Sequence, residues 1–218
     1  MASAVSRWMC LRGLSVKSEF ALPWGVCDLV GVRFSARKTR QRLSLGQTRP
    51  VGSLMRLLIL SRIPDSETGK ALSIARLERE SSSFISPQLL SKEISALKRD
   101  RFLVSPRHGT LQKVNGWAPL HTEVVAVELK LYRVSEAIGQ ATANRHFATH
   151  SYVALPLARA VRFAKGRNAD AFSQNGIGLL GVSARACHEL LRPRENIVPP
   201  DTLLQMHVVE RFWRTRGN

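Results

Sequence analysis

The longest pattern of apolar and polar positions lies in the C-terminal half of the chain. Residues 122–131, TEVVAVELKL, are apolar on both faces except at their charged end, which predicts a central strand. Helical and strand patterns alternate after it, at residues 134–146, 151–155, 157–165, 176–183 and 188–192. This order predicts an α/β protein built from strand–helix–strand units, with the last segment as an edge strand.

A second apolar run lies near the N-terminus. The break Pro23-Trp24-Gly25 precedes residues 26–32, which read as a strand that follows a turn. Strand alternation places Asp28 on the face that Val26 and Val30 share. Residues 35–50 are rich in Arg and punctuated by Gly and Pro, which predicts a loop or linker.

Between these two regions the apolar period becomes helical. Residues 54–63 and 71–79 fit helices, and Ser86-Pro87 is an N-cap followed by a first-turn proline that opens a third helix through residue 98. Residues 101–117 predict a hairpin. Three helices followed by a hairpin are the plan of a winged helix. The expected parts are an N-terminal core segment, a winged-helix-like insertion and a C-terminal core segment, at residues 1–50, 51–117 and 118–218.

Charge composition indicates the class of partner. Of 218 residues, 33 are Lys or Arg and 16 are Asp or Glu, so the formal net charge is +17, while the hydrophobic fraction of 44% is ordinary for a folded chain. A folded protein that is basic throughout most often binds nucleic acid, because each cation set on a phosphate releases counterions. DNA is therefore the expected partner. An anionic membrane surface is the weaker alternative, and an aromatic fraction of 6% offers little stacking surface for RNA.

The cysteines and the hydropathy pattern bear on the compartment. Cys10, Cys27 and Cys187 are odd in number and lack CxxC spacing, which favours neither a disulfide framework nor a zinc site. No apolar run approaches the roughly 18 residues that cross a bilayer. The first 18 residues lack acids, as transit peptides do, but a cytoplasmic protein with an ordinary start is the preferred interpretation.

The candidate chemistry lies where the two apolar runs end. Glu128 and Lys130 are two residues apart, so both side chains lie on one face of the predicted strand. Burying these charges without a purpose costs several kcal/mol. Asp28 also ends an apolar segment, and with Glu128 it offers the oxygen ligands that a hard divalent cation prefers. Lys130 is suited to steady an attacking water or a scissile phosphate, so the set indicates a phosphodiesterase.

This set resembles the PD-(D/E)XK nuclease superfamily, which has the restriction-endonuclease-like fold. Glu128-Leu129-Lys130 matches the (D/E)XK half of the motif, and Asp28 matches its metal-binding aspartate. The resemblance implies a mixed sheet flanked by helices and a catalytic site for DNA hydrolysis, with Mg²⁺ held by Asp28 and Glu128. It further implies that Glu19 is the acidic residue of the first helix and Gln140 the glutamine of a later helix.

Two features depart from that family's pattern. Cys27 replaces the motif's proline, and 100 residues separate Asp28 from Glu128 where the family has a short hairpin. The winged-helix-like segment is then an insertion between the two motif strands. The alternative function is a non-catalytic DNA-binding protein that retains a nuclease-like fold.

Each site residue also has a structural interpretation. Glu128 and Lys130 as a solvated ion pair contribute only about 0 to 1 kcal/mol. Asp28 then caps a hairpin turn, Glu19 is a solvated helix end, and Gln140 is a surface residue of a helix.

The insertion presents polar and basic side chains on its third helix and its hairpin. Those suited to DNA contacts are Gln88, Lys92, Arg99, Arg101, Arg107 and Lys113. The alternative is a helical subdomain that packs on the core. Their clustering in a basic segment of a basic chain favours DNA binding.

Overall fold

The computed structural model describes residues 1–114, 119–194 and 199–213. The chain divides into two compact units, the first made of residues 1–34 and 121–205 and the second of residues 35–120 and 206–218. The first boundary therefore falls after residue 34 and not after residue 50. The last residues also belong to the second unit, whereas the sequence placed them in the C-terminal core segment. No helix among the described residues is long and apolar enough to cross a membrane.

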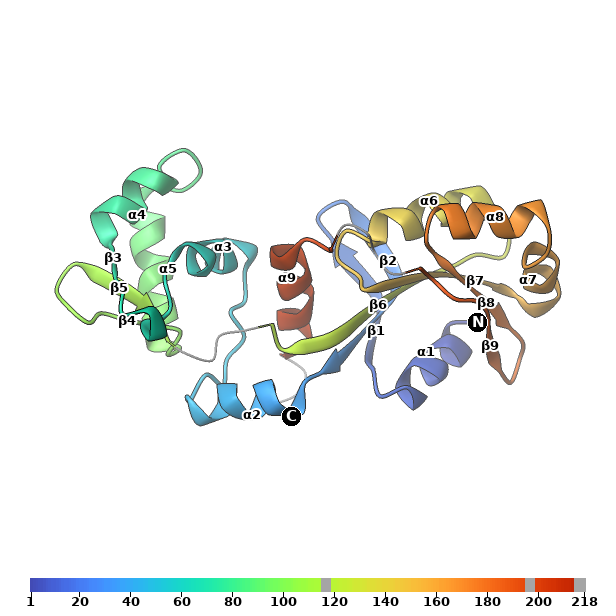
Figure 1. Ribbon diagram of the computed structural model, residues 1–218, viewed down its shortest axis with the longest axis horizontal. Helices are drawn as coiled ribbons and strands as arrows, with labels where there is room; N and C mark the ends of the chain where they lie inside the picture. The colour runs from blue at the N-terminus through green and yellow to red at the C-terminus, as the bar shows by residue number, and fades with distance from the viewer. Residues whose placement is uncertain (115–118, 195–198, 214–218) are drawn as a thin grey trace. The chain divides into compact units, whose positions relative to one another are not determined.

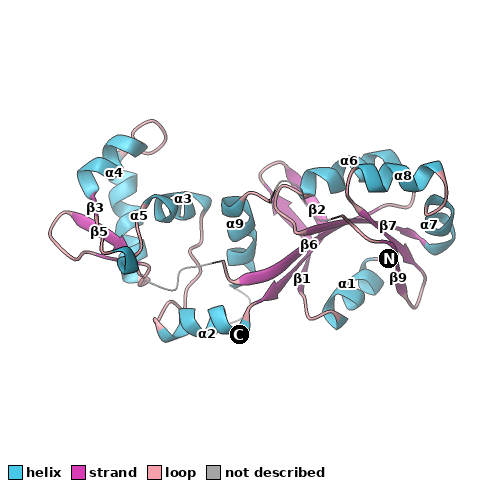
Figure 2. Ribbon diagram, viewed as in Figure 1, coloured by secondary structure: helices cyan, strands magenta, loops and turns pink. Residues whose placement is uncertain are grey.

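The first unit is built on a six-stranded mixed sheet, in the order β1-β2-β6-β7-β8-β9 (Figures 1 and 2). β1, β2 and β6 are antiparallel, β6, β7 and β8 are parallel, and β9 returns antiparallel at the edge. The strands are β1 (Ser15–Leu22), β2 (Gly25–Phe34), β6 (His121–Leu129), β7 (His150–Pro156), β8 (Gly178–Val182) and β9 (Cys187–Leu191). The predicted α/β class, with a mixed sheet flanked by helices, is confirmed.

Helices cover both faces of this sheet. Figure 1 shows α1 (Ala2–Leu11) on one face, with α6 (Val134–Asn144) and α8 (Arg167–Gln174) on the other. Met9 of α1 packs so close to Gly31 that a Cβ there would lie 2.6 Å from the methionine methyl group. The opposite face packs apolar side chains of β7 and β8 against α6, α7 (Leu157–Phe163) and α8. The strands β6, β7 and β8 are buried on both sides, as their continuous apolar runs predict.

Three elements of the first unit were not predicted: α1, β1 and α8. α1 carries only two buried residues, Val5 and Met9, and β1 has a single buried residue, Phe20. Such sparse apolar positions give no clear period in the sequence, and neighbouring elements fix the structure of these segments.

The second unit contains a three-stranded sheet in the order β3-β5-β4 and several helices. Its elements are α2 (Ala36–Ser44), α3 (Leu54–Arg62), η1 (Ser66–Thr68), β3 (Leu72–Ser73), α4 (Ile74–Ser81), α5 (Pro87–Arg99), β4 (Leu103–Val104) and β5 (Thr110–Lys113). The predicted three helices and hairpin are all present, and β3 adds a third strand to the hairpin. Residues 115–117 of the predicted hairpin lie outside the described residues.

A buried arginine lies at the centre of the second unit. The predicted linker forms α2, and Arg42 of that helix is 1% exposed. Its guanidinium bonds both oxygens of Glu210, at 2.5 and 3.1 Å, where Glu210 belongs to α9 (Thr202–Trp213). The guanidinium also lies over the rings of Phe102 and Trp213, at 5.0 and 4.4 Å from their centroids. α2 therefore belongs to this unit, because its one buried side chain is a core residue there.

Candidate functional site

β2 and β6 bring Asp28 and Glu128 together although 100 residues separate them in sequence. The antiparallel ladder between the strands ends with Leu29 opposite Val127, and Asp28 and Glu128 are the next residue on each strand. Asp28 Oδ2 accepts a hydrogen bond from the Leu129 backbone N–H at 2.7 Å. The Asp28 side chain thus holds the end of β6 at the point where backbone pairing stops.

Glu128 is 2% exposed, and two polar side chains surround it. Asn144 Nδ2 donates to Glu128 Oε1 at 2.7 Å, and the same amide nitrogen lies 3.5 Å from Cys27 Sγ. Burial raises the pKa of Glu128, and the charge of Asp28 raises it further. The hydrogen bonds from Asn144 and Cys27 and the charge of Lys130 lower it, so these three groups favour the carboxylate.

Cys27 directly precedes Asp28 on β2. Its thiol is buried and lies 3.4 Å from the carbonyl oxygen of Leu29. Burial raises the pKa of the Cys27 thiol, and the negative charge of Glu128 raises it again. The group therefore stays a protonated hydrogen-bond donor and is no candidate nucleophile.

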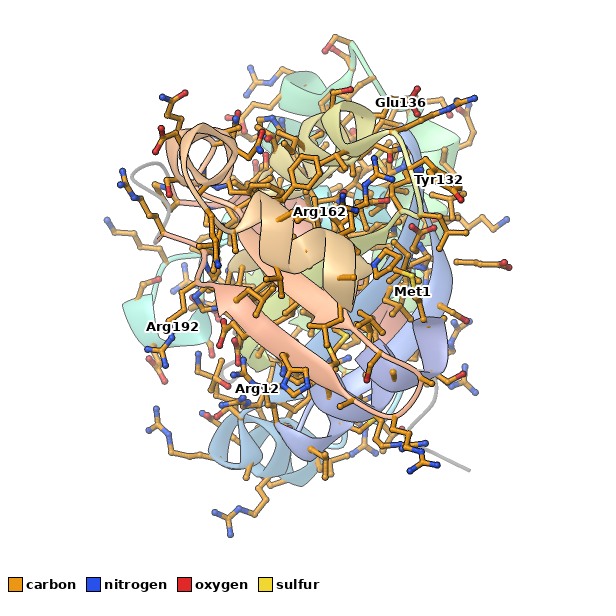
Figure 3. The ribbon with its side chains drawn as sticks, turned by 90° about the vertical axis from the view of Figure 1, so that its right-hand side faces the viewer. Met1, Arg12, Tyr132, Glu136, Arg162 and Arg192 are labelled. Carbon is orange, nitrogen blue, oxygen red and sulfur yellow. The ribbon has the colours of Figure 1, made fainter. Side chains whose placement is uncertain are left out.

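Lys130 follows the last residue of β6, and its backbone N–H donates to the Ala154 carbonyl at 3.1 Å. The next two residues, Leu131 and Tyr132, are 58% and 70% exposed. Arg159 Nη1 donates to the Leu131 carbonyl at 3.1 Å, and its guanidinium lies 5.4 Å from the centroid of the Tyr132 ring. Figure 3 shows Tyr132 on the same side of the unit as Glu136, beside α6. A basic and aromatic loop therefore continues from the Glu128-Leu129-Lys130 triplet.

A pocket of about 250 Å³ opens beside Glu128. Trp24 of the β1–β2 turn and Val26 of β2 form one wall, and Gln140 and Asn144 of α6 form another. Trp24 is 47% exposed, and its ring lies 6.2 Å from that of Phe147. The predicted site residue Gln140 is exposed and lines this pocket, so α6 brings it to the same place as Glu128.

Glu19 does not lie where the sequence placed it. It was expected at the end of a helix, but it lies in β1, is exposed, and has a φ of 47°. Its neighbours Ser18 and Phe20 pair with Leu29 and Cys27, so Glu19 stands across from Asp28. Turn-like backbone geometry at this point interrupts the pairing of β1 with β2.

The described residues contain no group of three or more His, Cys, Asp and Glu side chains that is arranged to hold a metal ion. Asp28 and Glu128 supply two carboxylates, and Leu129 lies directly after Glu128 on β6, with its backbone N–H bonded to Asp28. The carboxylates are hard oxygen donors of the type that Mg²⁺ binds, usually with one or two carboxylates and several waters. The donor chemistry fits Mg²⁺, although one oxygen of each carboxylate already accepts a protein hydrogen bond.

The predicted DNA-contact residues of the second unit differ in their surroundings. Gln88, Lys92 and Arg107 are exposed. Lys113 is not: its side chain is 12% exposed and its Nζ lies 3.7 Å from Asp65 Oδ1. Most of the Lys113 side chain is therefore covered, and its ammonium group already has an acidic neighbour in Asp65. Arg99 is the last residue of α5, Arg101 follows the C-cap residue Asp100, and both line a second pocket.

Asn144 is the residue of the site that the sequence analysis missed. It lies on the buried face of α6 with Val134, Ala137 and Ala141, where every other member is apolar. A polar side chain at such a position needs a buried partner, and this was the available signal.

Comparisons with known proteins give no further assignment. No protein-family model matches the chain, and no curated protein matches it in sequence. A solved structure that is similar to it is the SPO1766 protein of unknown function from Silicibacter pomeroyi, with a TM-score of 0.47 and 9% identity over 99% of this chain and 82% of that chain. The function proposed below therefore rests on this chain's own residues.

Proposed function

We propose that the protein is a metal-dependent DNA phosphodiester hydrolase of the PD-(D/E)XK type. One observation carries the proposal: Asp28 lies next to Glu128-Leu129-Lys130 where two adjacent strands end, and a pocket opens beside Glu128. The order α1-β1-β2-β6-α6-β7 also supports it, because an Asp strand, an ExK strand, a helix and a further strand are the order that the resemblance implies.

The roles of the residues follow from their surroundings. Asp28, Glu128 and the Leu129 carbonyl would hold Mg²⁺, which when bound activates water and neutralises charge on the phosphate. Lys130 stabilises the negative charge that develops on the phosphorus oxygens. Asn144 positions Glu128 by donating to Oε1, and Gln140 contacts substrate from the pocket wall. Glu19 is a secondary contributor, since it stands across from Asp28.

The distribution of charge supports DNA as the substrate. The second unit carries nineteen of the 33 basic residues and seven of the 16 acidic ones, so its net charge is +12 and that of the first unit is +5. Gln88 and Lys92 of α5 and Arg107 of the hairpin are exposed, and in this proposal they would contact the backbone of a duplex. The free thiols Cys10, Cys27 and Cys187 suit a reducing compartment, and we place the protein in the cytoplasm.

Lys130→Ala tests the catalytic assignment. The variant should lose cleavage of a labelled duplex in Mg²⁺ and bind that duplex with nearly unchanged affinity, because one lysine contributes little to so basic a surface. Lys165→Ala is the matched control, because Lys165 is an exposed lysine of the first unit that does not belong to the triplet. Wild-type cleavage by Lys130→Ala would reject the mechanism. DNA binding without cleavage by the wild-type protein would identify a non-catalytic DNA-binding protein instead.

A further inference from the structure

The second unit contains a pocket of about 410 Å³ that is separate from the Asp28–Glu128 site. Two segments line it, the chain after α2 and the residues around the C-terminal end of α5. The lining residues are Gly46, Thr48, Arg49, Arg99, Asp100 and Arg101. Three arginines and one aspartate give the pocket an excess of two positive charges.

A buried carboxylate holds two of these arginines. Asp100 Oδ1 lies 3.3 Å from Arg99 Nε and 3.6 Å from Arg49 Nη1. The Asp100 side chain is 6% exposed, whereas those of Arg99 and Arg49 are 64% and 68% exposed. Asp100 therefore orients both side chains, while most of the surface of each one stays open to solvent.

Hydrogen bonding of its backbone and a close contact with Gly46 fix the position of the third arginine, Arg101. Its φ of 64° is in the left-handed region, which is costly for a residue other than glycine. Gln47 is fully buried, and its Nε2 donates to the Arg101 carbonyl at 3.0 Å. The Arg101 guanidinium packs against Gly46, where an added Cβ would lie 2.4 Å from Nη1. The left-handed conformation of Arg101 belongs to the end of α5, because the Arg101 N–H donates to the Lys98 carbonyl at 3.0 Å and the Phe102 N–H donates to the Leu97 carbonyl at 2.8 Å. This helix end fixes the point at which the Arg101 side chain leaves the backbone.

We propose that this pocket binds a phosphate group, in the form of a phosphodiester of the DNA backbone. Planar guanidinium groups bind phosphate oxygens in pairs of parallel charge-assisted hydrogen bonds, which lysine cannot match. Three arginines line the pocket, and contacts with Asp100 and Gly46 hold their side chains in place. The choice of DNA as the source of the phosphate rests on the proposed function; the phosphate chemistry does not.

Variants that keep the charge distinguish this site from general electrostatic attraction. Arg101→Lys and Gly46→Ala both preserve the net charge of the chain. The first removes the paired hydrogen bonds, and the second displaces the guanidinium from its place beside Gly46. Arg79→Lys is the control, because Arg79 is exposed on α4 and lies outside the pocket. Circular dichroism and thermal unfolding identify variants that fold, and Arg101→Lys carries the test if Gly46→Ala does not fold.

Fluorescence anisotropy with a labelled DNA duplex measures affinity over a range of salt concentrations. We expect Arg101→Lys and Gly46→Ala to bind the duplex at least about fivefold more weakly, since charge-assisted hydrogen bonds are lost. Arg101→Ala should also lower the slope of log affinity against log salt by about 0.9, the value for one released phosphate contact. Arg79→Lys should match the wild type. Equal affinity of folded Arg101→Lys and wild type would overturn the phosphate site.

Inorganic phosphate distinguishes the two sources of the group. If phosphate raises the unfolding temperature of the wild type and not of Arg101→Lys, while no duplex binds, the pocket takes a free phosphate and the DNA assignment fails. If the wild type binds and cuts the duplex but Arg101→Lys does so equally well, the phosphate site fails and the proposed function stands. Loss of cleavage in Lys130→Ala, with phosphate binding retained, supports both.

Discussion

Replacing Glu128 by Gln is expected to stabilise the folded protein at neutral pH while abolishing cleavage. Glu128 is 2% exposed, and burial and the charge of Asp28 raise its pKa. A carboxyl whose pKa is higher in the folded state binds its proton more tightly there. Below the ordinary carboxyl pKa of 4.5 the group is protonated in both the folded and the unfolded state, and its burial then carries no charge. As the pH rises through the folded pKa the group ionises in the folded protein, and the free energy of unfolding falls. Gln is neutral at every pH, and its carbonyl oxygen can still accept from Asn144.

The size of the stabilisation by Glu128→Gln follows from the free energy needed to bury a charged carboxylate that lacks full solvation. That cost is about 1 to 3 kcal/mol, and each unit of difference between folded and unfolded pKa contributes about 1.4 kcal/mol. Chemical denaturation in EDTA, from about pH 4 to pH 8, measures the free energy of unfolding. We expect the gap between Glu128→Gln and the wild type to be close to zero at the acidic end and to widen as the pH rises.

Glu136→Gln is the matched control for this series, because Glu136 is on α6 with a side chain that is 54% exposed. Its free energy of unfolding should follow that of the wild type across the whole range. A Glu128→Gln protein that is less stable than wild type at pH 8, or a gap that does not change with pH, would refute the reasoning. Either result would mean that the buried carboxylate is stabilised by its neighbours more than burial destabilises it.

Three further substitutions test other parts of the structure. Asn144→Ala removes a hydrogen bond that lowers the pKa of Glu128, so the pH–rate profile for cleavage should shift to higher pH; lower activity without that shift would contradict the positioning role. Arg42→Met leaves Glu210 buried without its partner and should lower the free energy of unfolding by about 3 to 5 kcal/mol. The control Arg76→Ala breaks an exposed pair and should change that free energy by less than about 1 kcal/mol. Equal effects of the two substitutions would contradict the core role of Arg42. Trp24→Ala should weaken binding of single-stranded DNA by about 1 to 3 kcal/mol if a base stacks on the ring, and unchanged affinity would exclude that contact.

The sheet of the first unit was predictable because its strands bury both faces. β6, β7 and β8 are continuous apolar runs, and the helix that joins β6 to β7 has a clear period, so sequence pattern and tertiary environment agree. The pairing of β2 with β6 was not visible in the same way. It depends on a contact across 100 residues, and the resemblance to a known motif suggested that contact where periodicity could not.

The second unit shows why the domain boundary was misplaced. Residues 35–50 look like a linker because they are basic and contain Gly and Pro, and the one core side chain of α2 is an arginine. A pattern based on apolar residues cannot detect a core position occupied by Arg42. The burial of Arg42 is explained by its ion pair with Glu210 and its contacts with the rings of Phe102 and Trp213, all of which lie far from it in sequence.

The two units divide the electrostatic requirements of the proposed reaction. In the first unit, Asp28 and Glu128 need surroundings that tolerate a buried carboxylate. A high positive charge beside them would weaken their affinity for a divalent cation. In the second unit, which has a net charge of +12, exposed arginines and lysines would supply an affinity for DNA that falls with salt. Substitutions at the carboxylates should therefore change cleavage, metal dependence and the pH dependence of stability. Under the proposed function, substitutions at the Arg49, Arg99 and Arg101 pocket should change the affinity for DNA and its dependence on salt. They should leave metal dependence nearly unaltered, since the pocket contains none of the proposed metal ligands.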